Sequence, residues 1–132
     1  MRKIVLSLSL VLLLSACSQK EQFTLPVPET SAKVLLHEGD MAHYRDGLEK
    51  GVVVGDFSKL QKFDNKTILP FVVSNQGSGV FYYIALFKDK KFVKSFFIGD
   101  RIKIKSIKQK EDTLVVIYIT RDKQEKTKQF KL

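Results

Sequence analysis

Runs of five to eight apolar residues, rich in β-branched and aromatic side chains, recur along this chain from Val52 onward. Such runs, separated by short turn segments, are typical of strands, and connections so short cannot carry parallel crossovers. We therefore expect a mainly β fold: a small antiparallel sandwich or barrel-like meander of about 6–8 strands, with any helix of the domain confined to about 38–48. The pattern predicts strands near residues 52–57, 68–74, 80–88, 91–98, 101–108, 113–120 and 126–131.

Two of these segments are apolar on both faces, namely residues 80–87 and 114–119. A strand of this kind is expected to be central in its sheet and covered on both sides. Lysines interrupt the segments 101–108 and 126–131 instead, which is how edge strands avoid pairing with other chains. The consecutive aromatics Phe81, Tyr82 and Tyr83 must point alternately to opposite faces, so we expect them to pack both layers, the alternative being a phenol at the mouth of a pocket.

Glycine and aspartate mark two of the expected turns. Gly77 and Gly79 flank Ser78, and glycine tolerates the positive φ that tight turns demand. Gly99 and Asp100 suit a second tight turn, with Arg101 directly after it. We expect Asp100 to cap backbone amides and Arg101 to pair with a carboxylate such as Asp56, both in structural roles.

The N-terminus has the features of a signal peptide over residues 1–16: Arg2 and Lys3, then an apolar stretch over 4–16. This stretch is too short to cross about 30 Å of hydrocarbon as a helix. Its end, Leu14-Ser15-Ala16-Cys17, resembles the lipobox of bacterial lipoproteins, which implies cleavage between Ala16 and Cys17 and covalent diacylglycerol on Cys17. The alternative is an ordinary secretory signal that ends near a cysteine.

An acylated protein of this kind is tethered to the membrane without spanning it. Ser18 follows the cysteine, which by resemblance to the sorting rule of enteric lipoproteins favours the periplasmic face of the outer membrane. Residues 17–32 are polar and contain Pro26 and Pro28, so we expect a flexible tether there. The remaining residues, 33–132, are then one antiparallel β domain.

The chain is basic, with 23 lysines and arginines against 14 acids and a net charge of +9. Residues 88–132 carry a net +8 of it. An outward lysine face there would attract anionic envelope ligands such as lipid A, glycan or anionic headgroups, although lysines also simply solvate strands. The residues expected on this face are Lys103, Lys105, Lys126 and Lys128. Nucleic acid is an unsuitable partner because the signal directs the domain out of the cytoplasm.

The sequence contains no convincing catalytic or metal-binding pattern. His37 and His43 are six residues apart, whereas helical metal ligands want spacings of three or four. Ser78 lacks the Gly-x-Ser-x-Gly elbow of a serine nucleophile. We therefore expect no catalytic residue, no metal and no cofactor beyond the acyl groups on Cys17.

Two of these motifs together resemble small uncharacterised bacterial lipoproteins. Gly77-Ser78-Gly79 leads into the aromatic strand, and Gly99-Asp100-Arg101 follows at the expected separation. The resemblance implies a lipid-anchored β domain and supplies no activity. Relatives often carry a turn suited to calcium, but only Asp56, Asp64 and Asn65 lie among lysines here.

The expected function is a non-enzymatic, membrane-anchored domain that binds or scaffolds another envelope component. The alternative is a dedicated binder of anionic envelope ligands through the lysine face.

Overall fold

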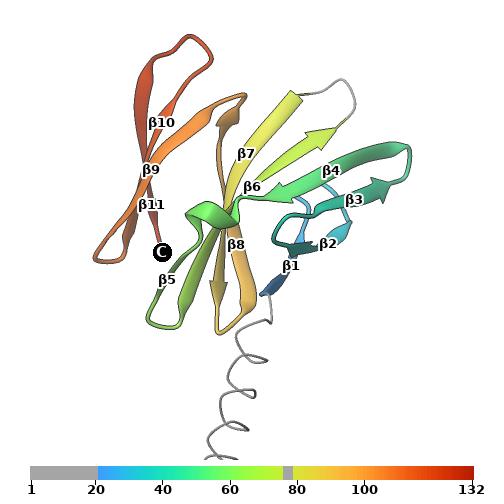
Figure 1. The fold of residues 1–132 in the computed structure, drawn as a ribbon, viewed down its shortest axis with the longest axis horizontal. Helices are drawn as coiled ribbons and strands as arrows, with labels where there is room; N and C mark the ends of the chain where they lie inside the picture. The colour runs from blue at the N-terminus through green and yellow to red at the C-terminus, as the bar shows by residue number, and fades with distance from the viewer. Residues whose placement is uncertain (1–20, 76–78) are drawn as a thin grey trace, which may run out of the picture.

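The computed structural model describes residues 21–75 and 79–132, which form a set of strands and one short 3-10 helix (Figure 1). Within these residues the elements are β1 (Gln22–Pro26), β2 (Lys33–His37), β3 (Met41–Asp46), β4 (Glu49–Gly55), η1 (Phe57–Lys59), β5 (Gln61–Phe63), β6 (Lys66–Asn75), β7 (Gly79–Lys88), β8 (Lys91–Asp100), β9 (Lys103–Lys110), β10 (Thr113–Ile119) and β11 (Glu125–Lys131). The prediction of a mainly β fold is confirmed, but the expected 6–8 strands are too few.

All of the described strand pairs are antiparallel, and they form three sheets. The largest sheet has the order β3-β4-β6-β7-β8, with β5 paired to the beginning of β6. A second sheet has the order β11-β10-β9, and β1 pairs only with β2. The short connections noted in the sequence thus join neighbouring strands as hairpins, as antiparallel pairing requires.

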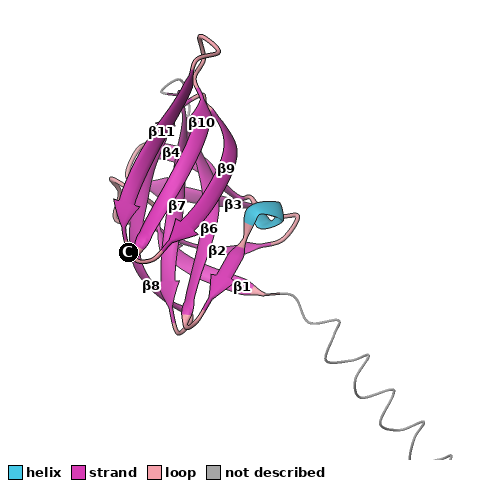
Figure 2. Cartoon of the chain, turned by 90° about the vertical axis from the view of Figure 1, so that its left-hand side faces the viewer, coloured by secondary structure: helices cyan, strands magenta, loops and turns pink. Residues whose placement is uncertain are grey.

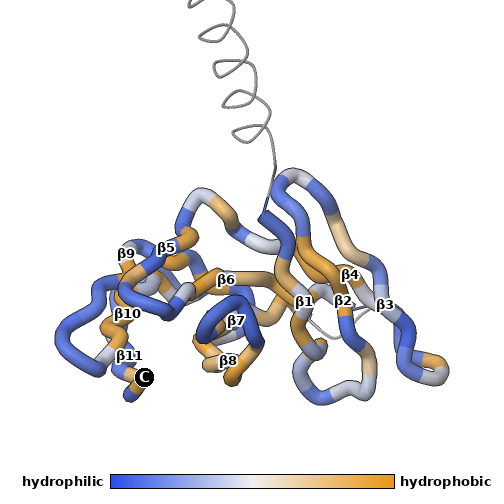
Figure 3. Tube along the Cα trace, turned by 90° about the horizontal axis from the view of Figure 1, so that it is seen from below, coloured by the Kyte–Doolittle hydropathy of each residue, from blue (hydrophilic) through white to orange (hydrophobic). Residues whose placement is uncertain are grey.

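The six-stranded sheet lies between the other two sheets, with β9–β11 on one side and the β1–β2 hairpin on the other (Figure 1). Figure 2 views the molecule from the side of β9–β11. On one face, Leu69 and Phe87 join a core with Phe23 and Leu25 of the β1–β2 hairpin. On the other face, Ile68 and residues of β7 and β8 pack against β9 and β10. Figure 3 shows β6 coloured as hydrophobic over most of its length, which fits a strand that contributes side chains to both cores.

The segment 38–48, to which the sequence confined any helix of the domain, contains β3 and the turn that joins it to β4. Met41 lies opposite Val54, and Tyr44 lies opposite Gly51. Gly47 has a φ of +61°, which suits a hairpin turn better than a helix. Only one face of β3 enters the core, through Tyr44, so its sequence lacks the continuous apolar run that marks the later strands.

The prediction of a flexible tether over 17–32 is wrong for residues from Gln22 onward. β1 pairs with β2 from Gln22↔His37 to Pro26↔Lys33. Phe23, Leu25 and Val27 are only 3%, 1% and 1% exposed. Their alternation with polar residues is the strand period, and the two prolines that suggested a tether stand at the end of β1 and in the turn after it. The folded domain therefore includes β1 and does not start near Lys33.

The two strands expected to be central are central. β7 pairs with β6 and β8, and its residues enter both cores, for example Phe87 on one side and Ile84 on the other. β10 pairs with β9 and β11, but only one of its faces is buried, so that part of the prediction is wrong. Val115, Ile117 and Ile119 are half-buried because, within the described residues, no layer packs outside the three-stranded sheet.

The turn expected at Gly99–Asp100 lies slightly later in the chain. Both residues belong to β8, and the residue with positive φ is Arg101, at +51°. Gly99 is required for another reason, since a Cβ there would lie 2.9 Å from Ile102 Cγ2. Arg101 stands where the chain leaves the six-stranded sheet for the three-stranded one. Gly77 and Ser78 lie outside the described residues.

Asp100 has the capping role expected of it. Its Oδ1 accepts a hydrogen bond of 3.0 Å from the backbone N–H of Val80, which ties the end of β8 to the beginning of β7. Arg101 does not pair with Asp56; its Nη1 lies 3.2 Å from Asp100 Oδ2. The Asp56 carboxylate is instead engaged by Ser58 and Lys59 of its own turn.

Candidate functional site

The four lysines that were expected on one face of the C-terminal sheet lie on its two opposite faces. Across β10, Lys126 lies opposite Tyr118 and Lys128 opposite Val116, so both belong to the face that carries the core. Lys128 Nζ donates to the carbonyl of Ile98 at 2.8 Å and bridges β11 to the edge of β8.

Lys103 instead lies opposite the half-buried Ile119 on the outer face of the same sheet. Lys105 pairs with Glu125, which also lies opposite Ile119. The prediction of one common face for these four lysines is therefore wrong. Side chains of one strand alternate in direction, and a register shift opposite Ile117 and Tyr118 adds one residue to β9.

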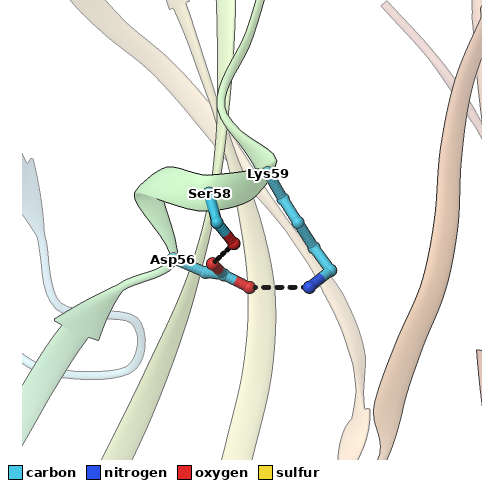
Figure 4. Close-up of polar contacts among 3 residues, drawn as sticks. All are labelled: Asp56, Ser58 and Lys59. Carbon is cyan, nitrogen blue, oxygen red and sulfur yellow. Dashed lines mark hydrogen bonds and ion pairs between the residues drawn. The ribbon is translucent and has the colours of Figure 1, made fainter.

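A first cleft, of about 370 Å³, lies between the six-stranded and three-stranded sheets beside η1. Its wall is apolar, with Val72, Tyr82 and Ile104, and its rim carries Asp56 and two lysines, Lys59 and Lys103. Asp56 Oδ1 accepts a hydrogen bond of 2.5 Å from the Ser58 hydroxyl, and Asp56 Oδ2 accepts one of 3.1 Å from Lys59 Nζ (Figure 4). The carboxylate is thus already engaged within its own turn.

The pKa of Asp56 reflects this turn. Partial burial pushes it upward, but the hydrogen bonds from Ser58 and Lys59 outweigh burial and hold it below the ordinary value of 3.8. A carboxyl whose folded-state pKa is depressed stabilises the fold above its unfolded-state pKa, and that stabilisation disappears as pH falls through the folded-state value.

Asp56→Asn is therefore expected to lower the stability of the domain at pH 7, by less than about 1 kcal/mol since the pair is solvent-accessible. The difference from wild type should shrink toward zero as pH falls below about 3.8. Urea melts of both proteins between pH 7 and pH 3 measure it, with Asp122→Asn on the exposed β10–β11 turn as control. A difference that stays constant over this range would contradict the role given to Asp56.

A second cleft, of about 280 Å³, is lined by three aromatic rings and one carboxylate, and we call it the aromatic cleft. It consists of Pro28, Glu29, Phe81, Tyr83 and Phe97. The Tyr83 and Phe97 rings meet edge to face at 5.4 Å, and Phe81 lies 6.4 Å from Phe97. On its other side Tyr83 stacks on Phe71 of the core at 5.3 Å. The Tyr83 ring is therefore packed between the core residue Phe71 and the cleft residue Phe97.

The aromatic cleft combines an exposed apolar surface with a negative charge. Phe97 is 46% exposed, which is unusual for a large aromatic on a strand. Burial raises the pKa of Tyr83 and the negative charge of Glu29 raises it further, so the phenol is neutral and able to donate a hydrogen bond. Lys128 Nζ lies 5.3 Å from the centre of the Phe97 ring, so this ring already attracts a cation.

Neither histidine that the sequence singled out belongs to a cleft described above. His37 ends β2 and His43 lies on β3. Over residues 21–75 and 79–132, no three His, Cys, Asp or Glu side chains gather as metal ligands. Asp56 bonds to Lys59, while Asp64 lies in the β5–β6 turn, so the two do not form the calcium-type turn of the resemblance. Ala16 and Cys17 lie outside the described residues.

Sequence reasoning offered a phenol at the mouth of a pocket only as an alternative and did not identify the aromatic cleft as a site. Phe81 and Tyr83 were expected to be packing residues, and they do point opposite to Tyr82, which lines the other cleft. The missing residues were Glu29, because its segment looked like a tether, and Phe97. The sequence did contain one signal for the cleft. Phe97 directly follows Phe96, so one of the two rings must point away from the core of β8, at a position where the strand is otherwise largely polar.

Compared with protein-family models, with curated proteins and with solved structures, the chain gives no match. In the part of the chain that the structure describes, no helix is long and apolar enough to cross a bilayer.

Proposed function

We propose that this chain is a lipid-anchored bacterial envelope protein whose β domain binds or scaffolds another envelope component without catalysing a reaction. The lipobox sequence that ends in Cys17 supports the anchor. The observation that carries the binding role is the aromatic cleft, with Phe97 46% exposed beside Glu29. The favoured location is the periplasmic face of the outer membrane, since Ser18 follows the cysteine.

The composition of the aromatic cleft favours contact with a partner. Exposed tyrosine and phenylalanine are enriched in protein interfaces, where rings with few rotatable bonds bury much area at low entropic cost. Glu29 gives the cleft a negative charge in a strongly basic chain. A fitting partner presents an apolar group to the rings and a cation or hydrogen-bond donor to this carboxylate.

The position of the aromatic cleft suits a domain that is anchored at its N-terminus. Glu29 lies in the turn after β1, seven residues beyond the beginning of that strand at Gln22. At about 3.3 Å per strand residue, β1 carries the chain some 15 Å away from its point of entry. The cleft therefore lies beyond the far end of β1 from the point where the anchor would enter.

A photoreactive phenylalanine analogue in place of Phe97 tests this function in cells. We expect a discrete crosslinked product that disappears when Glu29→Arg is added, because the partner must meet both groups. The matched control carries the analogue at Leu48, which is 102% exposed on the β3–β4 turn. The proposal is wrong if residue 97 gives no product, or only the products that residue 48 gives.

A second candidate is the binding of anionic envelope ligands by the outer face of β9. Lys103, Lys105, Lys108 and Lys110 are all exposed on this strand, and Glu125 pairs with one of them. Lipid A, anionic glycan and anionic lipid headgroups share the required charge. Binding through these lysines should weaken steeply between 50 and 500 mM salt, and it should be lost in the double variant Lys103→Glu, Lys108→Glu.

A further inference from the structure

The end of the domain where the chain enters β1 is basic. A shallow hollow of about 200 Å³ there is lined by Glu21 and Phe23 at the entry of β1 together with residues of two hairpin tips, β5–β6 and β7–β8. Five lysines, which we call the basic end, lie on these hairpins: Lys62, Lys66, Lys88, Lys90 and Lys91. Lys62 pairs with Glu21, so the entry point and the basic end are in direct contact. Figure 3 views this end and shows the β7–β8 tip as hydrophilic.

The two hairpin tips are held in line with each other. Lys66 lies opposite Lys88 in the sheet, and Lys88 lies opposite Lys91 across the next turn. The backbone N–H of Asp89 donates to the carbonyl of Asn65 at 2.8 Å and joins the tips directly. The lysines are therefore presented together by strands of the central sheet, as Figure 1 shows for the lower ends of β5 to β8.

The link between this end and the proposed anchor is short. Gln22 follows Cys17 by five residues, and even a fully extended chain of that length spans only about 17 Å. The inference therefore rests on the proposed lipid anchor: acyl groups on Cys17 would hold the entry of β1 at the membrane surface. At physiological salt, charges within about 8 Å of the headgroups still feel them.

We propose that the basic end docks on anionic lipid headgroups, so that the domain stands on the membrane with the aromatic cleft facing away from it. The five lysines outweigh the three acids of this end, Glu21, Asp64 and Asp89, by a net +2. Each net charge near an anionic surface improves partitioning about fivefold. The lysines of β9 belong to the layer on the opposite side of the central sheet from β1, so a short link favours the basic end over them.

The full mature chain, reconstituted in vesicles, tests the docking. Cys17 is the only cysteine and is acylated under the proposal, so Lys90→Cys carries a single dye. A cationic dye restores the charge that the substitution removes, and the same dye on Leu48→Cys and Lys108→Cys provides matched controls. With a quencher at headgroup depth, the dye at residue 90 should be quenched at least threefold more than either control in vesicles with 30% phosphatidylglycerol. In phosphatidylcholine alone, or at 0.5 M salt, this difference should shrink.

Charge reversal separates docking from anchoring. The double variant Lys88→Glu, Lys91→Glu should lose the quenching at residue 90 and still float with vesicles, because the acyl groups remain. Lys103→Glu, Lys108→Glu should change neither. A chain that floats without preferential quenching at residue 90 overturns the docking alone. A chain that fails to float on phosphatidylcholine vesicles at 0.5 M salt overturns the anchor and, with it, the docking.

Discussion

Leu25→Ala is expected to destabilise the domain by about 2–5 kcal/mol, because it removes a side chain that is 1% exposed and leaves a cavity between the β1–β2 hairpin and the central sheet. For a domain of this size, such a loss lowers Tm by about 10 °C or more. The neighbouring Phe23 contacts Phe87, with ring centres 4.8 Å apart, so Phe23→Ala should cost a similar amount. Thermal and urea melts measure both changes.

The control for this prediction is Thr24→Ala, which changes an exposed residue between the two buried ones. Thr24 projects from the opposite face of β1, so its loss should shift stability by less than about 1 kcal/mol. If Leu25→Ala melts like Thr24→Ala, residues 22–27 do not belong to the core and the domain starts later in the chain.

Cys17→Ser is expected to remove the protein from the membrane fraction, or to leave an uncleaved precursor, since a hydroxyl does not receive diacylglycerol. The effect should be close to complete, because two or three acyl chains anchor a protein stably, whereas the net +2 charge of the basic end alone binds headgroups weakly. Membrane fractionation with labelled fatty acid measures it. Labelled, membrane-bound mature protein in this variant would contradict the assignment of Cys17.

A matched substitution next to the cysteine completes that experiment. Ser18→Ala should leave acylation and membrane attachment intact, because the thiol of Cys17 alone receives the lipid. Loss of attachment in both variants would point to a damaged signal peptide instead of a lost lipid anchor.

Most of the strands could be predicted from the sequence because their apolar runs are long. β7 contributes Phe87 to one core and Ile84 to the other. A strand that buries both faces is apolar along its whole length, so it can be recognised from the sequence alone. The edge strands β9 and β11 could be predicted as well, because lysines interrupt both segments; in β9 they flank the buried Ile104 and Ile107.

The first three strands could not be predicted, because they lack the long apolar runs that mark the later strands. β1, β2 and β3 each bury one face, and five or six residues of alternating pattern resemble a polar linker. The expected lysine face failed because direction alternates along a strand: Lys126 and Lys128 share a face with Tyr118 and Val116 once the register is known. The aromatic cleft needs Glu29 and Phe97 together, which only the fold brings about.

The misassigned tether changes the functional proposal most. A long tether would hold the domain clear of the lipid, whereas under the proposed anchor a link from Cys17 to Gln22 of at most about 17 Å would hold one end of it at the surface. Under the proposed docking, the basic end would meet the headgroups, and the aromatic cleft would be presented to partners in the surrounding space.

The central claim is that Cys17 anchors this domain, and the most direct test is mass spectrometry of the protein extracted from membranes of its native host. The N-terminal peptide should begin at Cys17, lack residues 1–16, and carry diacylglycerol on the cysteine sulfur. An N-terminus at Met1, or a mature chain with an unmodified Cys17 thiol, would contradict the anchor.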